Sequence, residues 1–338
     1  MPDLIEKSPE ATAWMKEVLA VHAKGAAFDR VASSVIWSNA TDSDGALLVP
    51  VDPFELAAKI NDNPFPLLLR HDPGRPMGKV LVAKVFENSS GEIFVAAMLG
   101  LYESALKLGF GALGLDVLAE VQLPTELPAL PHDLRFEIGA DAREIDLETL
   151  YEIAREAPIP TDVQRRSHNA AEATLTLLQV SIPYMVLVWN PFIKAFATEA
   201  GKDSYAAVRY WLKKLSARLA KYQDPIVELQ STHEDCHVSF LVRGQNIARN
   251  YKALDALDGA AKRAAHLIAQ MGAAGFAPVR LVYEFLPDDD LWYPSFAELK
   301  DGRLVTDNAA LIAVENIPLG LSLGIVPASL AGPTGDDA

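Results

Sequence analysis

The sequence is poor in cysteine and in positive charge. Cys236 is its one cysteine, so no disulfide can form within the chain, and a single thiol fits a reducing compartment. The 30 Lys and Arg residues stand against 45 Asp and Glu residues, which gives a formal net charge of −15. Binding to phosphate backbones depends on a basic surface that releases counterions, so this charge argues against a nucleic-acid partner.

Other signatures are absent as well. Residues Met1–Glu6 show no basic stretch leading into an apolar one, so no secretory signal is expected and we predict a cytoplasmic protein. No Gly-x-x-x-x-Gly-Lys-[Ser/Thr] loop is present, which leaves a nucleotide hydrolase unsupported. The sequence has no internal repeat of the kind that marks solenoids. No cofactor is predicted.

What is present is an ordinary globular composition. Half of the 338 residues are hydrophobic and 22% are charged, enough for a sizeable core and for two domains. The first hundred residues are predicted to be mainly β, because β-type runs are separated by turn residues. The expected strands are 31–37, 66–70, 77–86 and 93–101, and the expected helices are 9–24 and 53–60.

The remainder of the chain alternates longer helices with strands. A helix is expected over 104–120, a proline-rich linker over 122–131, a strand over 134–138 and a helix over 147–156. Beyond residue 171, the expected strands are 174–182, 226–230, 237–243, 279–285, 297–299 and 303–306, and the expected helices are 195–222 and 247–274. This β-β-α-β-β order predicts one sheet with helices packed on one face.

The strongest local pattern lies between two of the predicted strands. It reads Arg70-His71-Asp72-Pro73-Gly74-Arg75-Pro76-Met77-Gly78-Lys79-Val80, and Asp42-x-Asp44-Gly45 precedes it. This pattern resembles the caudoviral prohead protease family, related in fold to the herpesvirus assemblins, over about residues 30–102. The resemblance implies a β-barrel serine peptidase in which His71 takes the proton of a serine nucleophile. An imidazole suits that role because it titrates near neutral pH.

The family's serine follows its histidine in a Gly-Leu-Ser-x-Gly strand, and that place holds no serine here. It reads Leu108-Gly109-Phe110-Gly111-Ala112-Leu113-Gly114-Leu115, and a similar string appears only at Gly320-Leu321-Ser322-Leu323-Gly324. In one interpretation Ser322 is the nucleophile and a large domain is inserted between barrel strands. In the other, which we favour, residues 321–328 resemble the family's final strand and the catalytic serine has been lost.

The predicted fold class is therefore α+β. A protease-like β-barrel is formed by N-terminal residues and a C-terminal closing strand within 309–328, and an α+β domain is inserted or appended. The predicted boundaries are 1–105 for the protease-like domain, 106–170 for a helix and linker region, 171–308 for the α+β domain and 329–338 for a flexible tail.

A polar cluster, His233-Glu234-Asp235-Cys236-His237, offers several zinc-ligand types within five residues. Structural zinc sites usually draw their ligands from two separated pairs, and consecutive residues in a tight turn point to different faces. We therefore interpret this cluster as a polar hairpin turn and predict no metal.

An uncharged stretch leaves a membrane alternative open. Residues 173–193 are 21 consecutive uncharged residues, close to the length that spans a bilayer, but the run contains Pro183 and Pro191. A buried strand, a turn and a helix start explain it equally well. The helix that follows carries six basic residues between 202 and 221, which fit an acidic partner, lipid headgroups or a solvated face balanced by acids elsewhere.

Three functions follow from these patterns. We predict a non-catalytic, protease-like barrel protein that acts on protein partners as a sensor, scaffold or assembly module, in a phage-related or antiphage role. The first alternative is a serine endopeptidase of the prohead-protease type that uses Ser322 and His71 on a peptide substrate. The second is a membrane-acting effector through 173–222. His71 by itself also fits a strand-end histidine bonded to Asp72 or to backbone, with no catalytic role.

Overall fold

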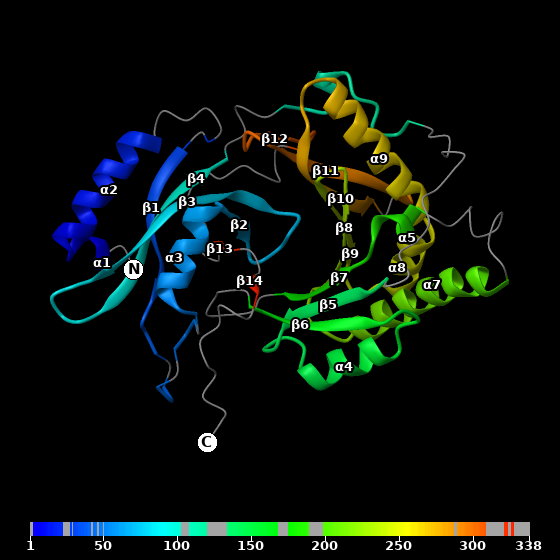
Figure 1. The fold of residues 1–338 in the computed structure, drawn as a ribbon, viewed down its shortest axis with the longest axis horizontal. Coiled ribbons are helices and arrows are strands. Elements are labelled where there is room, and N and C mark those ends of the chain that lie inside the picture. The colour runs from blue at the N-terminus through cyan, green and yellow to red at the C-terminus, as the bar shows by residue number, and fades with distance from the viewer. Residues whose placement is uncertain are drawn as a thin grey trace. The chain divides into compact units, whose positions relative to one another are not determined.

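Two β-sheets organise the chain (Figure 1). This computed structural model describes residues 3–22, 28, 30–41, 43–45, 47–49, 51–102, 108–119, 134–167, 175–188, 199–286, 289–308, 321–323 and 326–327. The first unit comprises Met1–Leu106, Arg166–Ala173 and Ala309–Ala338, and the second comprises Lys107–Arg165 and Thr174–Asn308. The predicted α+β class is confirmed.

The first unit contains an antiparallel five-stranded sheet in the order β1-β4-β3-β2-β13. Its strands are β1 (Arg30–Ser38), β2 (Phe65–Leu69), β3 (Pro76–Glu87), β4 (Ile93–Leu101) and β13 (Leu321–Leu323). β1, β2, β3 and β4 confirm the four strands expected in this part of the chain. β1 and β13 are the two edges, and the described residues contain no pairing between these edges that would close a barrel.

Helices cover both faces of this sheet. On one face lie α1 (Asp3–Glu6) and α2 (Pro9–His22), whose Met15 shares a core cluster with Phe86 and Phe94. On the other face α3 (Pro53–Asp62) packs Leu56 and Ile60 into a second cluster. α3 begins where expected because Asp52 Oδ1 accepts hydrogen bonds from two N–H groups of the first turn, at 2.9 Å each.

The second sheet is mixed, in the order β12-β11-β10-β9-β8-β7-β5-β6-β14. β7 runs parallel to β8 and β9 runs parallel to β10, and each parallel step is made possible by an intervening helical connection. The strands are β5 (Phe136–Asp141), β6 (Thr161–Ser167), β7 (Thr176–Ser181), β8 (Pro225–His233), β9 (Cys236–Arg243), β10 (Pro278–Leu286), β11 (Leu291–Leu299), β12 (Leu304–Val305) and β14 (Val326–Pro327).

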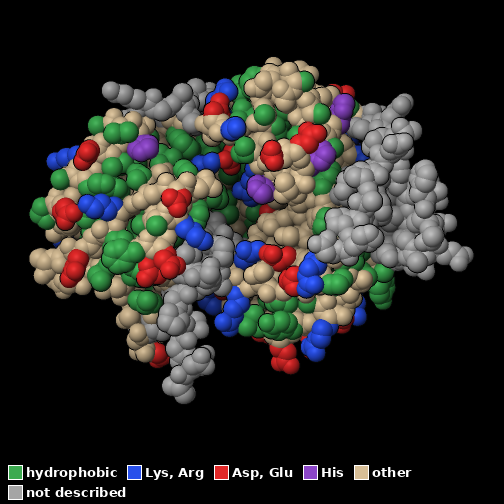
Figure 2. Space-filling view, viewed as in Figure 1, with side chains coloured by type: hydrophobic (Ala, Val, Ile, Leu, Met, Phe, Trp, Pro, Cys, Tyr) green, Lys and Arg blue, Asp and Glu red, His purple; other side chains and the backbone are tan. Residues whose placement is uncertain are grey.

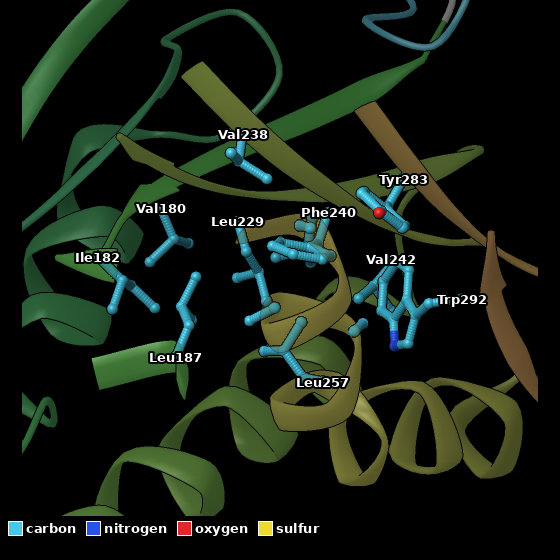
Figure 3. Close-up of a cluster of buried hydrophobic side chains, with 14 of the residues drawn as sticks. Val180, Ile182, Leu187, Leu229, Val238, Phe240, Val242, Leu257, Tyr283 and Trp292 are labelled. Atoms are coloured by element: carbon cyan, nitrogen blue, oxygen red, sulfur yellow. The ribbon is translucent and has the colours of Figure 1, made fainter. Parts of the chain in front are cut away.

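One face of this sheet forms the main core together with helices, as the strand and helix order predicts. The helices are α4 (Leu147–Arg155), α5 (Tyr184–Val188), α7 (Glu199–Leu219), α8 (Ile247–Asp255) and α9 (Leu257–Ala273). Figure 3 shows alternate strand residues such as Leu229 and Phe240 lying beside Leu187 and Leu257 from the helical side. Trp292 closes one end of this core, where its indole N–H donates to Ala253 O at 2.8 Å.

Three predictions about elements were wrong. The helix expected over 104–120 is absent from the described part, 108–119, where only a 3₁₀ turn, η2 (Gly111–Leu113), forms, because three glycines disfavour a helix. The helix expected over 247–274 is two helices that meet at Ala256. The strand β6 was not expected, because its sequence TDVQRRS has no apolar alternation. The proposed linker 122–131 and tail 329–338 lie outside the described residues.

The uncharged stretch 173–193 is part of the core as far as it is described. β7 lies between β5 and β8, and its Leu178 and Val180 are fully buried. α5 follows directly, with Tyr184 and Leu187 in the same core. These residues thus form the buried strand and helix start that we weighed against a membrane span. Among the helices that the structure describes, none is both long and apolar enough to cross a bilayer.

Candidate functional site

The predicted catalytic histidine lies in the tight turn that ends β2. Asp72 N–H donates to Leu69 O at 3.0 Å, and the two central residues of this turn, Arg70 and His71, have φ values of 52° and 64°. Positive φ at both central positions is the type I′ pattern, which normally selects Asn-Gly. Left-handed backbone costs about 1–2 kcal/mol for each side chain with a Cβ, so this turn stores strain at His71.

The segment after the turn is tied down by its own hydrogen bonds. Asp72 Oδ1 accepts from Gly74 N–H at 2.8 Å, Arg75 N–H donates to Asp72 O at 3.0 Å, and Leu69 N–H donates to Arg75 O at 3.0 Å. His71 itself is only 2% exposed. Asp72, Pro73 and Gly74 therefore have a structural task, because they return the chain from β2 into β3 and hold the histidine in place.

The glycine of the Pro-x-Gly-Lys-Val string also has a structural explanation. Gly78 lies where β3 passes closest to β4, and a Cβ built there would stand 2.0 Å from Gly100 O. Gly100 in turn is covered by the Phe28 ring, which stacks on Tyr102 with ring centroids 5.3 Å apart. Any side chain at residue 78 would push β3 away from β4. The spacing of the motif thus follows from hairpin geometry.

The structure brings the backbone of Ser322 to the strand that carries His71. β13 pairs antiparallel with β2, with Ser322 opposite Leu68 and Leu321 opposite Leu69. Leu69 is the last residue of β2 before the turn. Ser322 therefore lies on the neighbouring strand, opposite Leu68, which precedes His71 by three residues. The C-terminal segment therefore joins the N-terminal sheet.

The segment that would hold the family's serine lies elsewhere. Leu108–Leu115 belongs to the second unit, whereas His71 belongs to the first. It contains the η2 turn, and it is anchored by Thr306 N–H donating to Leu108 O at 2.7 Å. It holds Ala112 and no serine, and it is not the strand that the resemblance implies.

The polar cluster 233–237 is a two-residue hairpin turn between β8 and β9. Glu234 and Asp235 are its exposed central residues, with φ of 48° and 63°. His233 stacks on Tyr184 with centroids 4.4 Å apart, and burial lowers the pKa of this histidine. Cys236 is buried, and burial raises the pKa of its thiol to about 12. Among the described residues, no group of three His, Cys, Asp or Glu side chains is arranged to hold a metal ion.

Four basic residues of α7 are paired with acids of neighbouring elements. Arg209 and Lys213 contact Asp255 of α8, at 3.3 and 2.8 Å. Lys214 and Arg218 contact Glu156, the residue that ends α4, at 2.9 and 2.5 Å. Figure 2 shows acidic and basic side chains interspersed on the visible face. These contacts favour a balanced, solvated helix face over one reserved for lipid headgroups.

A buried carboxylate that sequence analysis missed lies on the sheet face opposite the helices. Glu228, in the middle of β8, is 1% exposed. It accepts hydrogen bonds from Gln179 Nε2 at 2.8 Å and from Ser239 Oγ at 2.7 Å, and Arg280 lies 4.0 Å away. These bonds link three adjacent strands. The sequence does carry one signal of this site: Glu228 lies between apolar residues in a strand that is otherwise typical of a core, where a charged side chain needs partners.

Comparison of the chain with protein-family models, with curated proteins and with solved structures gave no match.

Proposed function

We propose that the protein works without covalent catalysis, as a sensor, scaffold or assembly module built on a protease-like β-sheet. The observation that carries this proposal is that the segment aligned with the family's serine strand is an η2 turn with Ala112, in the unit that does not contain His71. A serine peptidase needs a hydroxyl within hydrogen-bond reach of its general base. That segment supplies none.

The hairpin supports the same proposal. Asp72, Pro73, Gly74 and Gly78 each have a structural task in the β2–β3 turn or in the β3–β4 contact. The motif can therefore persist without an enzymatic reaction, because the hairpin needs these residues in order to form. His71, at 2% exposure in a strained turn, then acts as a packed side chain of that hairpin. The phage-related or antiphage setting of such a module rests on the resemblance alone.

A second candidate, the serine endopeptidase, is favoured by one observation. β13 pairs directly with β2, so Ser322 lies on the strand beside the one that ends at His71. In this alternative His71 would remove the Ser322 proton and the hydroxyl oxygen would attack a peptide carbonyl. The two candidates differ in whether the Ser322 hydroxyl is nucleophilic.

A fluorophosphonate probe distinguishes the two candidates. The non-catalytic proposal expects no stoichiometric labelling of wild-type protein, and equal background for Ser322→Ala and for the exposed-serine control Ser89→Ala. Labelling of wild type that disappears in Ser322→Ala and in His71→Gly, but persists in Ser89→Ala, would establish the peptidase and overturn the proposal. Circular dichroism of each variant ensures that lost labelling is not lost folding.

A further inference from the structure

Among the described residues of the first unit, one long strand edge has no partner strand. β1 is an edge of its sheet and is nine residues long. The other sheet edges, β13, β12 and β14, are strands of two or three residues. A short edge strand is a common protection against pairing with other chains, and β1 is too long to be protected in this way.

The outer side of β1 has free backbone groups. Between Val31 and Ser38, the described hydrogen bonds to the β1 backbone are those of the ladder with β4, plus a contact of 3.4 Å from Ser34 Oγ to Val35 O. In an antiparallel pair, alternate residues direct their N–H and C=O groups away from the partner. The outward groups of β1 are therefore available to another strand.

Apart from Arg30 at its start, the sequence of β1 has nothing that blocks such pairing. From Val31 to Ser38 the strand has no proline and no charged residue, whereas exposed edges usually carry lysine, proline or inward-pointing charge. A bulge lies between Val35 and Trp37, so the regular part of the edge is its first half. Ser33 is exposed at the middle of that half.

Apolar side chains on both faces of β1 are only partly covered. Val31 and Val35 pack at the margin of the cluster under α2, and Ala32 and Ile36 pack at the margin of the cluster under α3. A strand added at this edge would extend both clusters and would bury these side chains further.

We propose that the occupant is a second copy of this chain, paired β1 to β1 in antiparallel register about a two-fold axis at Ser33 or Ser34. An isologous contact brings the same strand of both copies together, so an edge with charges of one sign would repel itself, and β1 is uncharged from Val31 to Ser38. With Ser33 on the axis, Val31 faces Val35; with Ser34 on the axis, Ala32 faces Ile36. Both registers place apolar side chains of the same sheet face opposite one another.

Net charge gives this interface a characteristic salt dependence. Each copy carries a formal charge of −15, so two copies repel one another at long range. Salt screens that repulsion and leaves the uncharged strand pairing intact. The dimer is expected to tighten as ionic strength rises, whereas an interface held by ion pairs would weaken.

Sedimentation or light scattering of the full chain over a concentration series provides the test. Wild type should approach twice 36.6 kDa, with a midpoint that moves to lower concentration in higher salt. Ser33→Lys should weaken the dimer by about fivefold, the upper size of one like-charge pair on a sheet, because the two new lysines lie opposite one another in one register and diagonally in the other. Ser89→Lys, in the exposed β3–β4 turn, adds the same charge away from β1 and should follow wild type once that added charge is allowed for.

Either of two results would overturn the proposal. One is a wild-type chain that stays monomeric up to its solubility limit, which would leave the edge to a different protein. The other is a dimer that Ser33→Lys and Ser89→Lys affect equally, which would place the contact elsewhere. Hydrogen exchange on wild type alone provides a measurement without a variant: amides in 31–36 should exchange more slowly as concentration rises, and unchanged exchange in a dimeric sample contradicts β1 pairing.

Discussion

Two hairpin turns of this protein share a backbone conformation and differ in what they do with it. The β2–β3 hairpin turns at Arg70-His71 and the β8–β9 hairpin at Glu234-Asp235, and all four residues have positive φ, between 48° and 64°. Neither turn has the glycine that this conformation favours. At β8–β9 the two strained side chains are exposed, whereas at β2–β3 His71 is buried to 2% exposure. The same backbone strain thus occurs at exposed side chains in the β8–β9 turn and at a buried, packed side chain in the β2–β3 turn.

The largest change in stability is expected at the contact between β3 and β4 that follows the β2–β3 turn. Gly78→Ala should lower the free energy of unfolding by about 3 kcal/mol, because the new Cβ would meet Gly100 O at 2.0 Å and only a backbone shift could relieve the clash. Urea denaturation measures the change. Gly272→Ala in α9, where a Cβ meets nothing within 4 Å, is the matched control and should be neutral or slightly stabilising. Equal effects at the two glycines would contradict the steric account of the motif.

The second prediction separates strain from packing at His71. His71→Ala should destabilise by about 2 kcal/mol because it empties a buried site, and His71→Gly should recover roughly 0.5–1 kcal/mol of that by accepting positive φ. At the equivalent position of the other turn, Asp235→Gly should have a higher free energy of unfolding than Asp235→Ala by a similar amount. Neither variant should be much less stable than wild type, because this side chain is exposed. If His71→Ala were as mild as Asp235→Ala, the histidine would have no packing role.

A smaller gain should come from the exposed turn. Replacing Glu234-Asp235 by Asn-Gly supplies the residues that a type I′ turn favours, and it should raise the free energy of unfolding by about 1 kcal/mol. Thermal and urea unfolding of the double variant measure the gain. A loss of stability would mean that Glu234 or Asp235 makes a favourable interaction that outweighs the strain of the turn.

The smallest expected effect is the pH dependence of His233. Burial lowers the pKa of His233 below its ordinary value of 6.5, so the unfolded chain binds more protons than the folded one in this range. Its contribution to stability is fully present above about pH 6.5 and is lost as pH falls through the lowered value. The melting temperature of wild type should therefore fall more between neutral and mildly acidic pH than that of His233→Phe, which keeps a ring against Tyr184. Parallel curves for the two proteins would exclude this titration.

Local sequence was sufficient for most elements. β-type runs bounded by turn residues indicated β1, β3, β4, β7 and β10, and the predicted helices matched α2, α3, α4 and α7 to within a few residues. These signals are local because they arise from side-chain direction and backbone φ within a few residues. The same reasoning failed at 108–119, where glycines disfavour the predicted helix. It also failed at β6, whose polar sequence gives no strand signal.

The candidate site could be predicted only in part. The string around His71 indicated a strand end and a turn, and that was confirmed. The left-handed backbone of Arg70 and His71 was not indicated by sequence, because neither residue favours positive φ and the conformation is imposed by the hairpin. Gly78 could be recognised in the sequence as a glycine of the motif. The steric need for a glycine there comes from the close approach of Gly100 O, which belongs to a later strand.

By itself the sequence determined the α+β class, the order of most elements and the residues of two hairpin turns. Only the tertiary structure decided which strands became neighbours: that β13 pairs with β2, that the charges of α7 meet Asp255 and Glu156, and that β1 remains an edge. Pairing between segments hundreds of residues apart follows from the hydrogen bonds and the apolar area of two partners together. No pattern within one segment contains that information.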